Sequence, residues 1–219
     1  MNIRKYNTYI FDCDGVILDS NKLKTSAFYH AVESYGKQAA EYFVQYHIAN
    51  GGVSRYRKID YFFSDILNIS VEACEKDRVL ALYAHLVREG LMNCEIASGL
   101  YALRKKFPEA VWMVASGGDQ KELREVFEAR NLSRLFDGGI FGSPDDKDAI
   151  VKREKTSSHF TAPAVFIGDS QLDHRVAKQE GIDFVFVYKW SEFLQWKNYC
   201  EENKIFYVQD LEGLNQYCT

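Results

Sequence analysis

The sequence lacks a strong excess of charge of either sign. It has 27 lysine and arginine residues against 31 aspartate and glutamate residues, which gives a formal net charge of −4 at pH 7. A protein that is drawn to nucleic acid or anionic lipid by its overall field carries a large positive charge. We therefore expect neither nucleic acid nor a membrane as a partner, and any affinity for phosphate has to be local.

Long apolar runs are also missing. None approaches the roughly 20 residues that a helix needs to span a bilayer. Asp12 follows so soon after the first apolar residues that the N-terminal segment has no room for the core of a signal peptide. We therefore expect a soluble protein without a membrane-spanning or targeting segment.

Cysteine is sparse and shows no pairing pattern. Five residues are scattered along the chain: Cys13, Cys74, Cys94, Cys200 and Cys218. Their odd number and the lack of a C-x-x-C spacing argue against a cysteine metal clip. A reducing compartment is the simplest interpretation, so a cytoplasmic localisation is predicted.

The residues that are abundant are typical of a well-packed globular protein, since 47% are hydrophobic and 15% aromatic. Short apolar runs predict five strands and a possible sixth, at residues 8–12, 110–116, 138–141, 164–169, 183–187 and 204–208. Such near-continuous runs suit a sheet that is covered on both faces. Helix-like segments, notably 118–132 and 173–181, lie between them. This alternation indicates an α/β protein with a doubly wound parallel sheet.

The interval between the first two predicted strands is too long for a single crossover. It contains helix-like stretches near residues 20–35, 39–48, 54–67 and 71–91. We predict a core of residues 1–19 and 93–219 with an inserted helical subdomain of residues 20–92. The insert starts just after Asp14, so we expect it to hang over the carboxyl ends of the strands, where open α/β sheets bind ligands.

Two carboxylates, Asp12 and Asp14, end the first predicted strand in the segment "YIFDCDGVILDS". Side chains two residues apart on a strand share a face, so these two would crowd together. The residues alone leave three interpretations open: a cation site, a pair tuned for acid–base chemistry, or an acidic turn in water.

Polar groups also follow three other predicted strands. The second strand ends in "VASGG", which sets the Ser116 hydroxyl and the Gly117 amide at a turn suited to phosphate. Lys147 follows the third strand, and Asp169 and Asp173 follow the fourth in "GDSQLD". Each group taken alone could be a helix cap or a solvated side chain. Separate local roles of this kind do not explain why all of these polar groups fall at one edge of the predicted sheet.

In this order, "DCDGV", Ser116 in "VASGG", Lys147 and "GDSQLD" resemble the four motifs of the haloacid dehalogenase superfamily of phosphotransferases. The insert is similar to the helical, C1-type cap that this superfamily carries between its first two strands. The resemblance covers nearly the whole chain and implies a Rossmann-like core. Within the superfamily, the sequence is similar to phosphoglycolate phosphatases and β-phosphoglucomutase-like phosphatases.

The resemblance implies that Asp12 attacks phosphorus and becomes an aspartyl-phosphate. Asp14 would give a proton to the departing alcohol and later take one from the attacking water. Crowding against Asp12 and enclosure by the cap are expected to favour the protonated form of Asp14. The implied cofactor is Mg²⁺, held by the Asp12 carboxylate, the Asp14 backbone carbonyl and Asp169.

Other roles follow from the same resemblance. Ser116 and the Gly117 amide would hold phosphate oxygens, and Lys147 would offset the negative charge of Asp12 and of the transferred group. Asp173 would orient Lys147 or metal-bound water, or bind the metal itself.

The insert carries "NGGVSRYRK" at residues 50–58, and its "GVSR" stretch from Gly52 to Arg55 is similar to the cap loop of β-phosphoglucomutases. This likeness implies a sugar-phosphate-like substrate whose second anionic or polar group binds Arg55. Lys24 is another candidate for this role, and it stands where those mutases have a cap histidine. Both Arg55 and Lys24 could instead be ordinary exposed helix charges.

Dehalogenases of the superfamily lack the second aspartate and phosphonatases replace it, so Asp14 favours a phosphatase or a phosphomutase. We predict a magnesium-dependent phosphatase for a small phosphorylated metabolite, either a sugar phosphate or a small phosphorylated alcohol. A β-phosphoglucomutase-like phosphomutase is the alternative. A non-catalytic relative that binds a phosphorylated ligand or a partner protein is a third possibility. The covered sheet gives no reason to expect more than a monomer.

Overall fold

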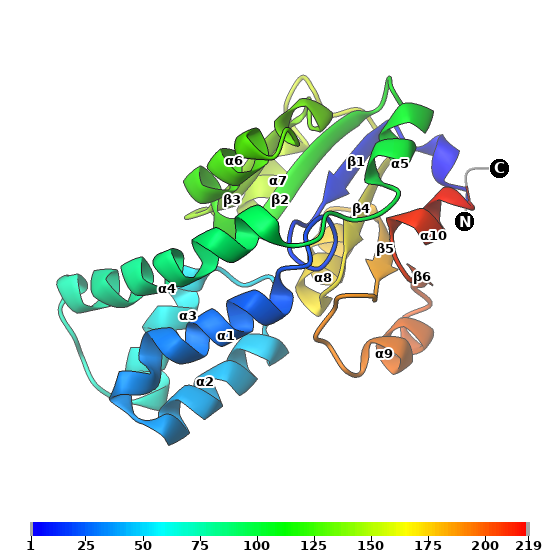
Figure 1. The fold of residues 1–219 in the computed structure, drawn as a ribbon. Helices are drawn as coiled ribbons and strands as arrows, with labels where there is room; N and C mark the ends of the chain where they lie inside the picture. The colour runs from blue at the N-terminus through cyan, green and yellow to red at the C-terminus, as the bar shows by residue number, and fades with distance from the viewer. Residues whose placement is uncertain (1, 218–219) are drawn as a thin grey trace.

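Six parallel strands form the centre of the computed structural model, which describes residues 2–217 (Figure 1). The strands are β1 (Thr8–Phe11), β2 (Val111–Asp119), β3 (Gly139–Ser143), β4 (Ala164–Gly168), β5 (Asp183–Val187) and β6 (Phe206–Val208). Their order across the sheet is β3-β2-β1-β4-β5-β6, and every neighbouring pair is parallel. The predicted class, an α/β protein with a doubly wound parallel sheet, is therefore confirmed.

Helices cover both faces of this sheet. Tyr9 and Phe11 of β1 belong to one apolar core, which also contains residues of α5, α6 and α10. Ile10, which lies between them, packs in a second core with residues of α7 and α8. All four residues of β1 are buried, which explains why this strand is an unbroken apolar run and not an alternating one. The helices of this part are α5 (Leu100–Lys106), α6 (Gln120–Ala129), α7 (Lys147–Glu154), α8 (Gln171–Gln179), α9 (Trp196–Glu202) and α10 (Leu211–Asn215).

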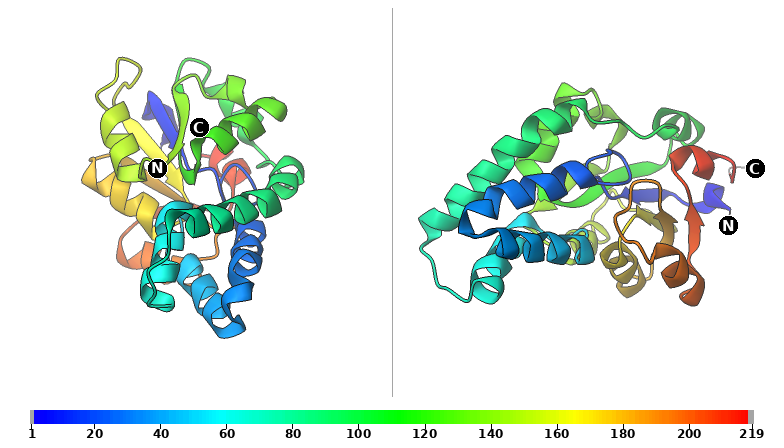
Figure 2. Two further views of the ribbon diagram at one scale, coloured as in Figure 1. Left: turned by 90° about the vertical axis from the view of Figure 1, so that its left-hand side faces the viewer. Right: turned by 60° about the horizontal axis from the view of Figure 1, so that its bottom comes forward.

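Helices fill the interval between β1 and β2, and they form a separate group beyond the carboxyl ends of the strands (Figures 1 and 2). They are α1 (Asn21–Val32), α2 (Lys37–Ala49), α3 (Arg55–Tyr61), which continues into a π-helical turn (Phe62–Ile66), and α4 (Ala73–Asn93). We call this group the helical insert. It packs around aromatic rings, since the ring of Phe28 lies 4.1 Å from that of Tyr83 and 5.3 Å from that of Phe43.

The four stretches predicted to be helical are helical in the structure, with ends that differ by a few residues. The predicted boundary between residues 92 and 93 falls inside α4, one residue before that helix ends. An antiparallel bridge between Leu18 and Ile96 joins the segment that enters the insert to the segment that leaves it. Among residues 2–217, no helix is long and apolar enough to cross a membrane.

Candidate active site

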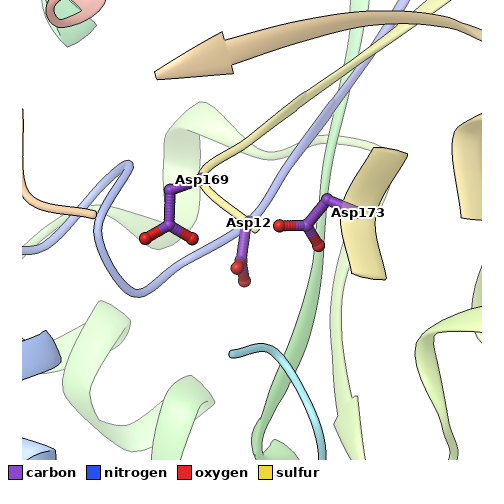
Figure 3. A group of neighbouring side chains, drawn as sticks. All are labelled: Asp12, Asp169 and Asp173. Atoms are coloured by element: carbon purple, nitrogen blue, oxygen red, sulfur yellow. The ribbon is translucent and has the colours of Figure 1, made fainter. Parts of the chain in front are cut away.

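Acidic side chains meet where β1 and β4 end side by side. Asp12 follows β1, and its backbone N–H donates to the carbonyl of Ile167 in β4 at 2.9 Å. Asp169 follows β4, and Asp173 lies on the first turn of α8. Figure 3 shows these three aspartates grouped at the sheet edge, and carboxylate oxygens of all three lie within 4.8 Å of one another. The sheet topology thus gathers the acidic groups that the sequence predicted at this edge.

A buried lysine links two of these aspartates. The Nζ atom of Lys147 lies 2.7 Å from Asp12 and 2.6 Å from Asp173, and the lysine side chain is fully buried. Asp173 is fixed further by Ser170, whose hydroxyl donates to Asp173 at 2.7 Å in the capping box of α8. The charges of Asp12 and Asp173 raise the pKa of Lys147, although its burial acts in the opposite direction. Lys147 therefore remains a cation beside Asp12.

One lysine does not balance three buried carboxylates. Burial raises the pKa of Asp12 to about 7, even though the charge of Lys147 lowers it. Burial, together with the charges of Asp12 and Asp173, raises the pKa of Asp169 well above its usual value. A hard divalent cation prefers carboxylate oxygens and would stabilise the ionised forms of these groups. The donor set of Asp12 and Asp169 therefore fits a Mg²⁺ ion, whereas both carboxylate oxygens of Asp173 are already taken, one by Lys147 and the other by Ser170.

The glycine after the second aspartate allows the loop to pass close to the Asp169 carboxylate. Gly15 has a φ of 77°, and a Cβ atom built on it would lie 2.2 Å from the Oδ2 atom of Asp169. A side chain at this position would therefore be strained and would also collide with a carboxylate. This contact explains the glycine of the "DCDG" segment.

Asp14 is bound by two donors from the start of the helical insert. The Nζ atom of Lys24 donates to it at 2.6 Å, and the Ser20 hydroxyl donates at 2.5 Å. Burial alone would raise the pKa of Asp14, but the charge of Lys24 and these hydrogen bonds together lower it. The expectation that crowding against Asp12 and enclosure by the cap favour the protonated form of Asp14 is wrong for this arrangement, because the charge of Lys24 and these hydrogen bonds outweigh the effect of burial.

The segment after β2 differs from the predicted turn. The helix was expected to begin at residue 118, but β2 continues to Asp119, and that side chain caps α6 by accepting from the backbone N–H of Glu122 at 2.9 Å. Ser116 is buried, and its hydroxyl oxygen accepts from the backbone N–H of Gly118 at 3.0 Å. Neither Ser116 nor Gly117 is thus part of a helix N-terminus.

Gly117 lies directly against the loop of the helical insert, and a side chain here would force the two apart. A Cβ atom on Gly117 would lie 2.2 Å from the carbonyl oxygen of Gly52, whereas one on Gly118 would meet its nearest neighbour, the Ser116 hydroxyl, at 3.3 Å. We expect Gly117→Ala to lower kcat/KM for any substrate roughly tenfold or more, because backbone atoms cannot turn away as a side chain can. Steady-state kinetics with Gly118→Ala as the matched control test this, and equal losses in both variants would contradict it.

The two basic residues predicted on the insert are buried. Lys24 and Arg55 are each 6% exposed, so the alternative that they are ordinary exposed charges is wrong. The guanidinium of Arg55 pairs with Glu122 of α6 and lies over the ring of Tyr83. Its Nε atom is buried and has no hydrogen-bond partner among the described residues.

The next two residues of α3 also contact the core. The Tyr56 hydroxyl donates to Asp119 at 2.7 Å, and Arg57 pairs with Asp146. Together with the pair of Arg55 and Glu122, these contacts tie the start of α3 to the starts of α6 and α7. The helical insert is thus held against the sheet edge by three consecutive side chains.

A cavity of about 390 Å³ lies between the helical insert and the sheet edge. Of the residues predicted from the sequence, it is lined by Asp12, Asp14, Lys24, Gly52, Arg55, Gly117 and Asp169. Ser116, Lys147 and Asp173 are buried and do not line it, although Lys147 lines a smaller neighbouring pocket. The acidic groups of the core and the basic groups of the insert therefore face the same cavity.

Several lining residues were not predicted. Asn21, the first residue of α1, donates to Asp169 at 2.8 Å and to the carbonyl of Trp190 at 2.9 Å. Lys58 and His47 also line the cavity. Lys58 is three residues after Arg55 and so shares its face of α3, a spacing from which it could have been found. Nothing in the sequence brings Asn21 to Asp169, because their contact depends on the tertiary fold.

Comparisons with known proteins agree with this architecture. A family model described as haloacid dehalogenase-like hydrolase matches residues 9–187, which is more than half of the chain. A search of curated proteins gave no significant match. Because the family model covers residues 9–187, the chain belongs to the haloacid dehalogenase-like hydrolases. The predicted family and the predicted enzyme class, a hydrolase, are confirmed.

Solved structures with the same fold cover nearly the whole chain. A predicted phosphoglycolate phosphatase from Haemophilus somnus 129pt has a TM-score of 0.72 at 15% identity, covering 99% of this chain and 100% of its own. A predicted phosphatase from Clostridium acetobutylicum has a TM-score of 0.72 at 16% identity, covering 96% and 97%. The HAD-type hydrolase YfnB from Bacillus subtilis, in a magnesium-bound form, has a TM-score of 0.66 at 18% identity, covering 98% and 99%.

Proposed function

We propose that the protein is a magnesium-dependent phosphatase that hydrolyses a small phosphorylated metabolite through an aspartyl-phosphate intermediate. The observation that carries this proposal is the position of Asp12, a buried carboxylate that lines the cavity between the insert and the core and is paired with a lysine. A carboxylate held in this way is a candidate nucleophile, and the cation beside it offsets the charge of an approaching phosphate. A sugar phosphate or a small phosphorylated alcohol fits within a cavity of this size.

In the first step, a carboxylate oxygen of Asp12 attacks phosphorus, and the bond between phosphorus and the alcohol oxygen breaks. The Oδ1 atom of Asp12 accepts from the backbone N–H of Cys13 at 2.7 Å, and Lys147 holds the Oδ2 atom. These contacts orient the carboxylate for an in-line approach. Water then attacks the aspartyl-phosphate, which releases phosphate and restores the Asp12 carboxylate.

Asp14 is proposed to give its proton to the leaving alcohol and to take one from the attacking water. In the structure, Lys24 and Ser20 favour its ionised form. The negative charge of a bound phosphate acts in the opposite direction and raises the pKa of a neighbouring carboxyl group. Asp14 can therefore take up a proton when substrate is bound and lose it when phosphate leaves.

A magnesium ion would be held by Asp12, Asp169 and the backbone carbonyl of Asp14, and would supply charge stabilisation to the transferred phosphoryl group. Asn21 would keep Asp169 in place, and Asp173 would do the same for Lys147. Gly117, which lines the cavity, is proposed to bind a phosphate oxygen, whereas Ser116 does not line it and its role in phosphate binding stays a prediction. The magnesium-bound form of YfnB supports this metal.

We assign the helical insert, residues 20–92, the role of a cap over the core, residues 1–19 and 93–219. The contacts of Arg55, Tyr56 and Arg57 with the core support this role. Lys24 stands where the mutases mentioned above have a histidine, and it is paired with Asp14, which supports a phosphatase over a phosphomutase. Asp12 and Asp14 are both retained, which argues against a non-catalytic relative. A cytoplasmic monomer without a nucleic-acid or membrane partner stays a prediction.

Magnesium-dependent release of phosphate tests the proposed function. Purified protein is expected to hydrolyse p-nitrophenyl phosphate with Mg²⁺, to lose at least about 90% of this activity in excess EDTA, and to recover it when Mg²⁺ is restored. A screen of phosphorylated metabolites ranked by kcat/KM then identifies the substrate. If neither p-nitrophenyl phosphate nor any metabolite releases phosphate, the proposed function is wrong.

A further inference from the structure

Lys58 is a buried basic residue that no step described above uses. It lies on α3, is 2% exposed and lines the cavity between the helical insert and the core. Its Nζ atom lies 2.6 Å from the Nδ1 atom of His47 and 5.7 Å from the centre of the Phe28 ring. None of the ion pairs formed by residues 2–217 includes Lys58. Lysine is almost never fully buried without an acidic partner, so this position calls for an explanation.

The other two cations on the insert side of the cavity already have acidic partners. Lys24 pairs with Asp14 at 2.6 Å, and Arg55 pairs with Glu122. Glu192, an acidic residue that also lines the cavity, accepts from the Thr25 hydroxyl at 2.6 Å. The arrangement therefore leaves Lys58 without a carboxylate. It also leaves the buried Nε atom of Arg55, another residue that lines the cavity, without an acceptor among the described residues.

His47 accepts a hydrogen bond from Lys58 and is not itself a second cation. Burial, reinforced by the charge of Lys58, lowers the pKa of His47 well below its usual value, so the ring is neutral. A neutral imidazole that accepts at Nδ1 carries its hydrogen on Nε2. Burial and the charge of Lys24 lower the pKa of Lys58 to about 7. An anion placed beside Lys58 would raise that pKa and compensate for the buried ammonium.

We propose that Lys58, positioned by His47 and assisted by the Arg55 Nε–H, binds a second anionic group on the substrate, at the end opposite the phosphate that is transferred. The inference rests on the proposed phosphatase function and narrows its substrate class to phosphate monoesters that carry a further acid group, either a carboxylate or a second phosphate. Asp12 and Lys58 line the same cavity, as a ligand that contacts both requires. Lys58 already donates to His47, and a carboxylate or phosphate would supply the anionic partner that it lacks and an acceptor for the Arg55 Nε–H.

Kinetics with matched esters test this proposal. The substrates are 3-phosphoglycerate and glycerol 3-phosphate, which share a carbon skeleton and differ in a carboxylate, together with propane-1,3-diol bisphosphate. The wild-type protein is expected to prefer an ester with a second acid group, and the comparison of the carboxylate with the bisphosphate shows which acid it is. The readout is the ratio of kcat/KM for the preferred acidic ester to that for glycerol 3-phosphate.

Lys58→Met keeps the length of the side chain but removes its charge. It is expected to lower that ratio roughly ten- to a hundredfold, the range for a hydrogen bond to a charged group. Lys37→Met, on an exposed lysine at the start of α2, is the matched control and is expected to leave the ratio unchanged. Because a ratio is measured on one preparation, partial unfolding of a variant does not alter it, and Lys58→Gln provides a second, polar replacement.

Two results would overturn the proposal: a wild-type protein that does not prefer acidic esters, or losses in Lys58→Met that are equal for acidic and neutral esters. A failure of the phosphatase function itself is recognisable separately, because p-nitrophenyl phosphate would then also resist hydrolysis. In that case isothermal titration calorimetry measures the dissociation constants of 3-phosphoglycerate and glycerol 3-phosphate. Their ratio then replaces the ratio of kcat/KM values. Tighter binding of the acid in the wild type, and not in Lys58→Met, would still support the anion site.

Discussion

Asp12→Asn is expected to lower kcat for p-nitrophenyl phosphate by more than about a hundredfold. The asparagine amide is a poor nucleophile, and the substitution also removes a carboxylate that would hold the metal. The fold is expected to remain, because Asp12 is surrounded by carboxylates that repel it and Lys147 keeps its contact with Asp173 at 2.6 Å. Steady-state kinetics measure the loss, and circular dichroism checks the fold.

Asp145→Asn is a suitable control for this variant, because Asp145 is exposed and pairs with Arg153 on the surface. Residual activity of Asp12→Asn above about one hundredth of the wild-type value would contradict a covalent mechanism. Modification by beryllium fluoride, a mimic of an acyl phosphate, is expected at Asp12 in the wild-type protein. A different modified residue would count equally against the assignment.

Asp14→Asn is expected to slow alkyl phosphates far more than aryl phosphates. The alcohol released from an alkyl ester is a strong base and needs a proton as it leaves, whereas p-nitrophenolate leaves with little help. General acid catalysis contributes about a hundredfold or more, so kcat for glycerol 3-phosphate should fall by that order and kcat for p-nitrophenyl phosphate much less. The ratio of the two rates is the measured quantity.

This variant also leaves Lys24 without its acidic partner, so a lower unfolding temperature is expected. Comparing two substrates on the same preparation cancels any loss of folded protein. Equal losses for both esters would show that Asp14 acts through the structure of the site or through its metal and not as a general acid.

The sheet could be predicted from the sequence because its strands are buried on both faces. Tyr9, Ile10 and Phe11 pack into two different cores, so each contributes to an apolar run that stands out without any long-range information. The gathering of Asp12 and Asp169 was predictable for a related reason, since the carboxyl ends of adjacent parallel strands meet at one edge.

The end of β2 and the protonation of Asp14 were not predictable in this way. Glycine after Ser116 suggested a turn, yet β2 continues beyond it. The register with β3 shifts between Ala115 and Asp119, and Asp119 then pairs with Ser143 of β3. In the sequence Asp14 lies two residues after Asp12, which suggested crowding between them. Its pKa depends instead on Lys24, which is ten residues later in α1 and donates to the Asp14 carboxylate. Both outcomes depend on contacts between segments, which neither composition nor spacing specifies.

The guanidinium of Arg55 pairs with Glu122 of the core, while its buried Nε atom has no hydrogen-bond partner among the described residues. A ligand that accepts from this atom would stabilise the same side-chain position that joins helix α3 to helix α6. By thermodynamic linkage, the contact between insert and core must then raise the affinity for that ligand by the same factor. Recognition of the substrate and closure over it are, on this account, one coupled equilibrium with Arg55 as the shared residue.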